Sequence, residues 1–103
     1  MDPAFTHYDL GWRHRGDVVQ VRLLGSAANV RLMSETDFQR YIGGQRYAFY
    51  GGLMDRSPIE LVVPVAGTWH VVVDLLGVGG SVQSGLLIRS APAESQDRLT
   101  VRT

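Results

Sequence analysis

The segment Thr68-Trp-His-Val-Val-Val-Asp-Leu-Leu76 carries the strongest strand pattern in the chain. Trp69 and two of the valines share one side of this segment, while His70 and Asp74 share the other side. Successive side chains of a β-strand point to opposite faces, so a period of two residues predicts one buried and one wet face. We therefore expect a sheet that buries the valines and leaves His70 and Asp74 in water.

Similar patterns recur between glycine- and proline-containing turns. Further strands are expected over residues 5–10, 17–24, 29–33, 45–50, 58–65 and 81–89, with 99–102 as a last strand or a disordered tail. Together they predict an all-β, single-domain β-sandwich over residues 5–90, jelly-roll-like, of about seven to eight strands. The expected core residues are Val19, Val21, Leu61, Val63, Trp69, Val71 and Val73.

Glycine-rich residues 77–80 are expected to form a hairpin that pairs 68–76 with 81–89. A phosphate-binding loop would need a helix to begin at this point, and another strand pattern follows instead. Pro58 opens the strand expected at 58–65, and proline suits an edge position in a sheet. Open edges in such a small domain make a homo-oligomer plausible.

One short helix is expected near residues 35–42. Ser34 can accept a hydrogen bond from the amide of Asp37, which is the arrangement of a helix N-cap, and acidic residues suit the first turn. Phe38 begins an apolar helical face, and Gly43-Gly44 ends the helix.

Composition excludes several classes of protein. The 103 residues are enough for one domain, and the chain contains no cysteine, which excludes disulfides, zinc–thiolate sites, iron–sulfur clusters and thiol catalysis. No apolar run approaches the length of a membrane span. Residues 1–4 carry no signal-peptide pattern, so a cytoplasmic location is expected. The same four residues are interpreted as a possible remnant of an expression vector. Residues 91–103 form a polar C-terminal segment.

The charged residues balance. Ten basic and ten acidic residues give a formal net charge of zero, and all ten basic residues are arginines. Sequence-independent binding to nucleic acid needs a clear positive excess, so no nucleic-acid partner is expected. The absence of lysine from the chain excludes a Schiff base and a phosphate-loop lysine.

The histidines are weak candidates for chemistry. His7 and Asp9 lie two residues apart, on one face of an expected strand, but a zinc site needs three or four protein ligands. Nothing in the sequence connects His14 or His70 to His7. We predict no metal, no cofactor and no catalytic residue; an enzyme that uses His7, Asp9 or His70 is the least favoured alternative.

The segment from Arg40 to Gly52 has the most unusual composition, with four aromatic residues and two arginines among glycines. Arginine and tyrosine are enriched at protein interfaces, which favours a non-enzymatic interaction or sensing module with an unidentified protein partner. The alternative is a sugar or nucleotide pocket lined by Tyr47, Tyr50, Trp12 and Arg56; the aromatic residues could equally belong to the core. The candidate binding residues are Arg40, Arg46, Tyr47, Tyr50, Arg56 and Trp12.

A set of motifs spread over residues 5–90 resembles a bacterial family of short proteins known as domain of unknown function 1883. The motifs are Phe5-Thr-His-Tyr-Asp-Leu-Gly11, Gly16-Asp-Val-Val, Asn29-Val-Arg-Leu-Met33, Phe38, Tyr41, Tyr50-Gly-Gly-Leu53, Ser57-Pro58 and Gly67-Thr-Trp-His-Val-Val-Val-Asp74. The resemblance implies a compact β-sandwich with a small helix, and it implies no activity. Some relatives place this domain before a Toll/interleukin-receptor-like domain, which suggests a sensing or adaptor role.

Overall fold

The computed structural model describes residues 5–91, which form seven β-strands and one α-helix. In chain order the elements are β1 (Phe5–Arg13), β2 (Val18–Gly25), β3 (Ala28–Ser34), α1 (Glu35–Ile42), β4 (Tyr50–Met54), β5 (Ile59–Val62), β6 (Gly67–Asp74) and β7 (Val82–Arg89). Within these residues, no helix has the length and apolar character that crossing a membrane requires. The strand considered at residues 99–102 lies outside the described residues.

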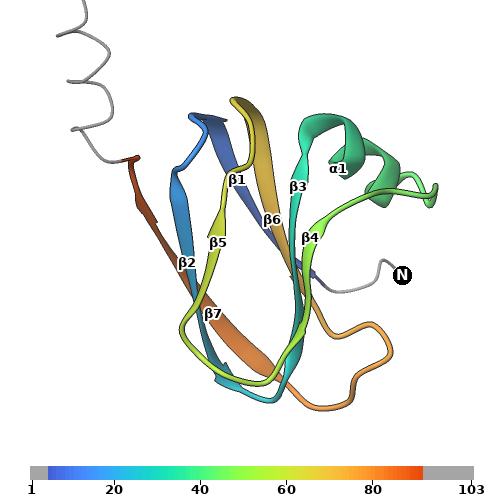
Figure 1. Ribbon diagram of the computed structural model, residues 1–103. Coiled ribbons are helices and arrows are strands. Elements are labelled where there is room, and N and C mark those ends of the chain that lie inside the picture. The colour runs from blue at the N-terminus through green and yellow to red at the C-terminus, as the bar shows by residue number, and fades with distance from the viewer. Residues whose placement is uncertain (1–4, 92–103) are drawn as a thin grey trace, which may run out of the picture.

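The strands form two antiparallel sheets. One has the order β1-β6-β3-β4, and the other has the order β5-β2-β7. Figure 1 shows the two sheets facing each other, and a single apolar cluster that draws on both of them fills the space between. These findings confirm the predicted all-β fold with one short helix, and they are consistent with a jelly-roll-like sandwich.

The predicted core residues lie between the sheets. Leu61 is partly buried and packs against the others, which are all buried: Val19, Val21, Val63, Trp69, Val71 and Val73. Burial of each large apolar side chain contributes about 1.5–3 kcal/mol to folding. The contact between the two sheets is therefore the main source of stability.

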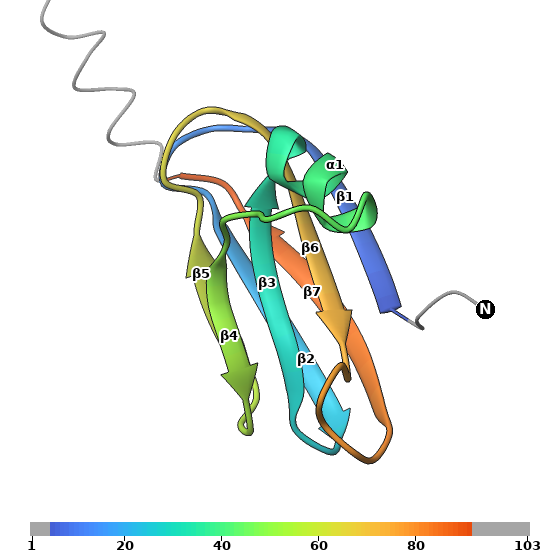
Figure 2. The same cartoon turned by 90° about the vertical axis from the view of Figure 1, so that its right-hand side faces the viewer.

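The outer side of β6 differs from the prediction. His70 is 3% exposed and Asp74 is 2% exposed, and Val72 between them is fully buried. Helix α1 packs on β3 and β6, and Figure 2 shows α1 lying across this face of the sheet. The expected wet face is wrong because a second layer covers it.

The glycine-rich connection is also corrected. β6 belongs to the first sheet and pairs with β1 and β3, whereas β7 belongs to the second sheet and pairs with β2. Residues 75–81 therefore carry the chain from one sheet to the other and do not form the expected hairpin. A glycine-rich turn suits either connection, so the local sequence does not distinguish them.

The strand expected at residues 45–50 is displaced. Residues 45–49 form no strand, and β4 begins at Tyr50, the last residue of the expected strand, and runs on through Gly51 and Gly52. Gly51 has φ +118°, and a Cβ at this position would lie 2.1 Å from the carbonyl oxygen of Val30 on β3. The glycine therefore allows β4 to approach β3 closely.

Two local predictions are confirmed. Ser34 caps α1 by accepting a hydrogen bond from the amide of Asp37 at 3.2 Å, and the helix ends at the expected residue, Ile42, with Gly43 as its C-cap. β5 is an edge strand, as Pro58 suggested, although it is shorter than the segment that was expected.

Candidate functional site

The covered face is the side of the β1-β6-β3-β4 sheet that α1 overlies. Alternation along β6 and β3 places His70 and Asp74 on this face together with Arg31. A small apolar cluster lies among them. Its members are Met33, Val72 and Phe38, with Phe5, Tyr41 and Tyr47 packed against it. This face therefore joins a second, minor core to a set of charged and titratable side chains.

The first polar group on the covered face is a chain of three side chains. Glu35, the first residue of α1, has Oε1 2.5 Å from Nε2 of His70. Nδ1 of His70 lies 2.8 Å from Nε2 of His7 on β1. We call Glu35, His70 and His7 the histidine chain. It runs from an exposed carboxylate through a buried imidazole to a second imidazole at the edge of the sheet.

Phe38 fixes the two imidazoles from the helix side. Its ring stacks on His7 with centroids 4.1 Å apart and on His70 with centroids 4.4 Å apart, in both cases at an interplanar angle of 13°. Stacked rings restrict rotation of both imidazoles. This contact could not be predicted from the sequence, because the three rings come from β1, α1 and β6.

Two of these groups have shifted acidities. Burial and the neighbouring His70 lower the pKa of His7 below 6.5, although Asp9 and Glu35 act in the opposite direction. Hydrogen bonds from Gln39 and His70 lower the pKa of Glu35 below 4.5. Near neutral pH these shifts favour a neutral His7 and an ionised Glu35.

The second polar group surrounds Asp74. Its carboxylate accepts hydrogen bonds from Asn29 Nδ2 at 2.8 Å, from the Tyr41 hydroxyl at 2.8 Å and from the Leu76 amide at 3.1 Å. Arg31 forms an ion pair with the same carboxylate. A buried charge needs such partners, because removal from water alone costs several kcal/mol.

The acidities of Asp74 and Tyr41 follow from this arrangement. Burial raises the pKa of Asp74, but the hydrogen bonds from Asn29, Tyr41 and the Leu76 amide outweigh it, so that pKa falls below 3.8. Burial and the hydrogen bond to Asp74 raise the pKa of Tyr41 well above 10.

Arg31, the cation paired with Asp74, also contacts the ring of Phe49, with its guanidinium carbon 5.3 Å from the ring centroid. The aspartate thus fixes α1 and β3 to β6.

The arginine- and aromatic-rich segment crosses the sheet next to this group. Figure 2 shows the chain turning back from α1 and crossing β3 to reach β4. The amide of Ala48 donates to Oδ1 of Asp37 at 3.1 Å, which ties the crossing segment to the helix. Residues 45–49 form no strand, and the amide of Ala48 is paired with this side chain instead of with a neighbouring strand.

Two hollows flank the crossing segment. The arginine hollow has a volume of about 450 Å³ and is lined by Asp37, Arg40, Arg46, Tyr47 and Ala48. The aromatic hollow has a volume of about 400 Å³. Its walls include Ser34, Phe49, Tyr50, Val65 and Trp69, and it shares Asp37 and Ala48 with the arginine hollow.

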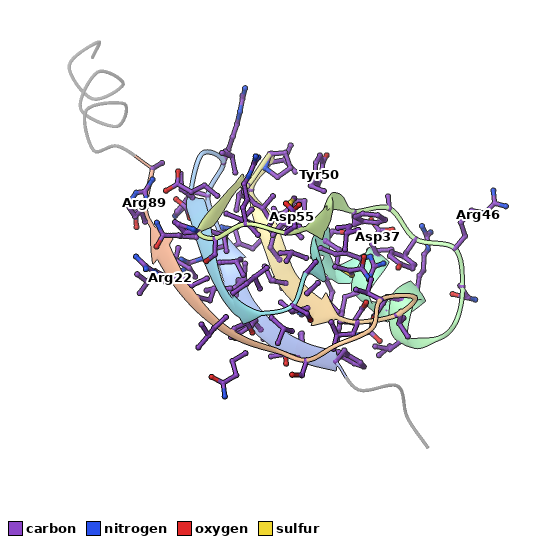
Figure 3. The ribbon with its side chains drawn as sticks, turned by 90° about the horizontal axis from the view of Figure 1, so that it is seen from below. Arg22, Asp37, Arg46, Tyr50, Asp55 and Arg89 are labelled. Atoms are coloured by element: carbon purple, nitrogen blue, oxygen red, sulfur yellow. The ribbon has the colours of Figure 1, made fainter. Side chains whose placement is uncertain are left out.

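The structure groups some of the predicted binding residues and separates others. Arg40, Arg46 and Tyr47 line one hollow, and Tyr50 lines the next. Figure 3 shows Arg46 projecting from the body of the molecule, with Asp37 between it and Tyr50. The six candidates remain predictions, and four of them lie on one continuous surface.

Trp12 and Arg56 lie elsewhere. Trp12 is 61% exposed and pairs with Thr68 at the end of β1, so β6 and β3 separate its strand from β4. Arg56 lies two residues beyond Met54, the last residue of β4, at the opposite end of that strand from Tyr50. Neither of them lines the two hollows.

Two features of this region were not predicted from the sequence. His70 was treated as unconnected to His7, yet their rings touch; His14 lies apart, in the turn where its amide donates to Asp17. Val72 lies on the same side of β6 as His70 and Asp74, and it is buried. An apolar residue at this position was a sign in the sequence that this side of the strand is covered. Over residues 5–91, no group of three histidine or acidic side chains is arranged to hold a metal ion.

Comparisons with known proteins give one match. A family model described as "Domain of unknown function (DUF1883)" matches residues 4–92, which include the seven strands of the described residues and the residues that line both hollows. No curated protein and no solved structure matches the chain.

Proposed function

The chain belongs to the DUF1883 family, and we propose that it is an interaction module that binds an acidic, aromatic-containing segment of a partner protein. The observation that carries the proposal is the pair of adjoining hollows, which share Asp37 and Ala48 and differ in chemistry. Such a surface suits a short extended peptide, because neighbouring side chains of the peptide could occupy both hollows.

Charge favours an acidic ligand. Arg40 lies 3.6 Å from Asp37, so these two charges largely offset each other. Arg46 pairs with no acidic side chain among residues 5–91. One net positive charge therefore remains at the arginine hollow, and a guanidinium binds carboxylates in a directional, bidentate manner.

The aromatic hollow suits an apolar or aromatic side chain. Tyr50 is 53% exposed, and its ring centroid lies 6.2 Å from that of Trp69. The indole of Trp69 donates to the carbonyl of Val65 at 2.9 Å, which holds the floor of the hollow in place. Tyrosine, tryptophan and arginine are the residue types that most often dominate binding energy at protein interfaces.

Selection from a displayed library of random twelve-residue peptides tests the proposal. We expect the wild-type chain to enrich peptides that place Asp or Glu near an aromatic residue. Arg46→Ala and Tyr50→Ala should each weaken binding of an enriched peptide by about fivefold or more, as expected for residues at the centre of an interface.

Matched controls lie on other surfaces. Arg22→Ala removes an exposed arginine from β2 in the other sheet, and Leu53→Ala removes an exposed apolar side chain from the same strand as Tyr50. Both should leave the affinity unchanged. Failure to enrich any peptide, or equal weakening by the controls, would reject the proposal.

A small ligand is the second candidate function. The volume of the aromatic hollow, about 400 Å³, falls within the range of small-molecule sites, and a sugar or nucleotide could stack on Tyr50. A thermal-shift panel of sugars and nucleotides separates the two functions. A ligand at a hundred times its dissociation constant stabilises the fold by about 2.7 kcal/mol. In a domain of this size, that added stability raises the Tm clearly.

A further inference from the structure

We propose that the histidine chain is a proton-binding latch that holds α1 on the sheet with no added proton or with one, and releases it when a second proton binds. The latch is formed by Glu35, His70 and His7, with Phe38 stacked on both imidazoles. This inference does not depend on the proposed binding function.

The proton positions follow from the contacts. Glu35 is an acceptor when ionised, so Nε2 of His70 must carry the hydrogen in their 2.5 Å contact. A neutral His70 then has a bare Nδ1, which accepts from Nε2 of His7 across 2.8 Å. A neutral His7 therefore has no hydrogen on Nδ1, and this nitrogen lies at the exposed end of the histidine chain.

One added proton breaks none of these contacts. It can bind at Nδ1 of His7, and the proton on Nε2 of His7 can move across to His70, whose Nε2–H still donates to Glu35. Either arrangement keeps both hydrogen bonds. The added positive charge lies close to Glu35 and Asp9, which are the carboxylates that favour a charged His7.

A second proton cannot be accommodated in this way. If both imidazoles are charged, Nδ1 of His70 and Nε2 of His7 each carry a hydrogen and face each other without an acceptor. If Glu35 takes the proton instead, the carboxylate charge at the start of α1 is lost. In the first case the two charged rings repel each other, and His7 is displaced from its stack on Phe38 of α1. In the second case Glu35 loses the charge that attracts His70. Either way α1 loses part of its attachment to the sheet.

Other charged groups around the latch do not provide a substitute. From β1 come His7 and Asp9, from β6 His70, and from α1 Glu35. Arg31 on β3 lies on the same face of the sheet, and it is engaged with Asp74. Release of α1 would therefore uncover the minor core under Phe38, while the main core between the sheets stays closed.

Nitrogen-15 NMR of the imidazoles tests the proton positions directly. At pH 7.5 we expect both His7 and His70 to be Nε2–H tautomers. Detection of hydrogen on Nδ1 of His7 in the neutral protein would contradict the proposal.

Amide hydrogen exchange of α1 from pH 7.5 to pH 4.5 tests the release. We expect protection of α1, relative to β2, to stay constant while the first proton binds and then to fall before the sheets lose theirs. Loss of protection in α1 and β2 together would overturn the proposal.

Glu35→Gln and Glu60→Gln form a matched pair. Both glutamates are exposed and accept side-chain hydrogen bonds, but Glu60 lies on β5 in the other sheet. We expect Glu35→Gln to speed exchange in α1 at pH 7.5 by about fivefold, because a neutral hydrogen bond replaces a charge-assisted one. Glu60→Gln should leave α1 unchanged, and equal effects of the two variants would reject the latch.

Discussion

Asp74 joins three parts of the covered face through its carboxylate. It is 2% exposed and has hydrogen-bonding partners on β3, on α1 and in the chain that follows β6. The alternation of β6 marked it as a wet residue, and only the packing of α1 explains its burial. A buried charge of this kind contributes little net stability when paired, but removal of one partner is costly.

The hydroxyl of Tyr41 offers a direct test of that dependence. Tyr41→Phe removes one hydrogen bond to the buried carboxylate and should lower the free energy of unfolding by about 1.5–3 kcal/mol. Tyr47 belongs to the same minor core, and its hydroxyl makes no hydrogen bond within residues 5–91. Tyr47→Phe should therefore stay within about 0.5 kcal/mol of wild type in urea unfolding. Similar losses for both variants would contradict this description.

Acidification should destabilise the chain through His7. Its pKa is lowered in the folded state, first by burial and then by His70, so the unfolded chain takes up the proton more readily. The free energy of unfolding should fall as the pH drops below 6.5 and through the lowered pKa of His7. Glu35, whose folded pKa is also lowered, adds a further loss below pH 4.5. Unfolding in urea at several pH values measures both steps.

A pair of histidine variants isolates the first step. His7→Asn should flatten the pH dependence just below neutrality, whereas His14→Asn changes an exposed turn residue and should preserve it. If the two variants gave the same slope, the pH dependence would have another origin.

The pairing of β4 with β3 depends on glycine. Gly51→Ala would place a Cβ 2.1 Å from the carbonyl oxygen of Val30 at φ +118°. Gly44 also has a positive φ, of +74°, but Gly44→Ala would meet open space around the new atom. The Gly44 variant should cost about 1–2 kcal/mol from backbone strain, and the Gly51 variant should cost more and reduce amide protection along β4. Equal costs would contradict the close approach.

Elements with local signals were predictable from the sequence, and those set by packing were not. The helix was placed correctly because Ser34, Phe38 and Gly43 mark its start, its buried face and its end within one short segment. Residues 45–49 alternate like a strand, but they form none, and the amide of Ala48 donates to the side chain of Asp37 on α1. The turn at 77–80 gives no local sign that β7 pairs with β2.

In the molecule as a whole, the two-sheet architecture followed from the strand patterns, but the sheet order did not. The order β1-β6-β3-β4 depends on contacts between residues far apart in the chain. The same limit applies to the candidate site. Arg40, Arg46 and Tyr47 could be grouped because they are neighbours in sequence, whereas the contribution of Trp69 to the aromatic hollow required the fold.

The binding surface is best tested by amide and indole NMR shifts of the full chain on titration with a peptide enriched in the library selection. We expect the changes to concentrate at the end of α1, along residues 45–50 and at the indole of Trp69. Changes confined to the β5-β2-β7 sheet, or a chain that enriches no peptide, would contradict the proposal that the two hollows form one binding surface.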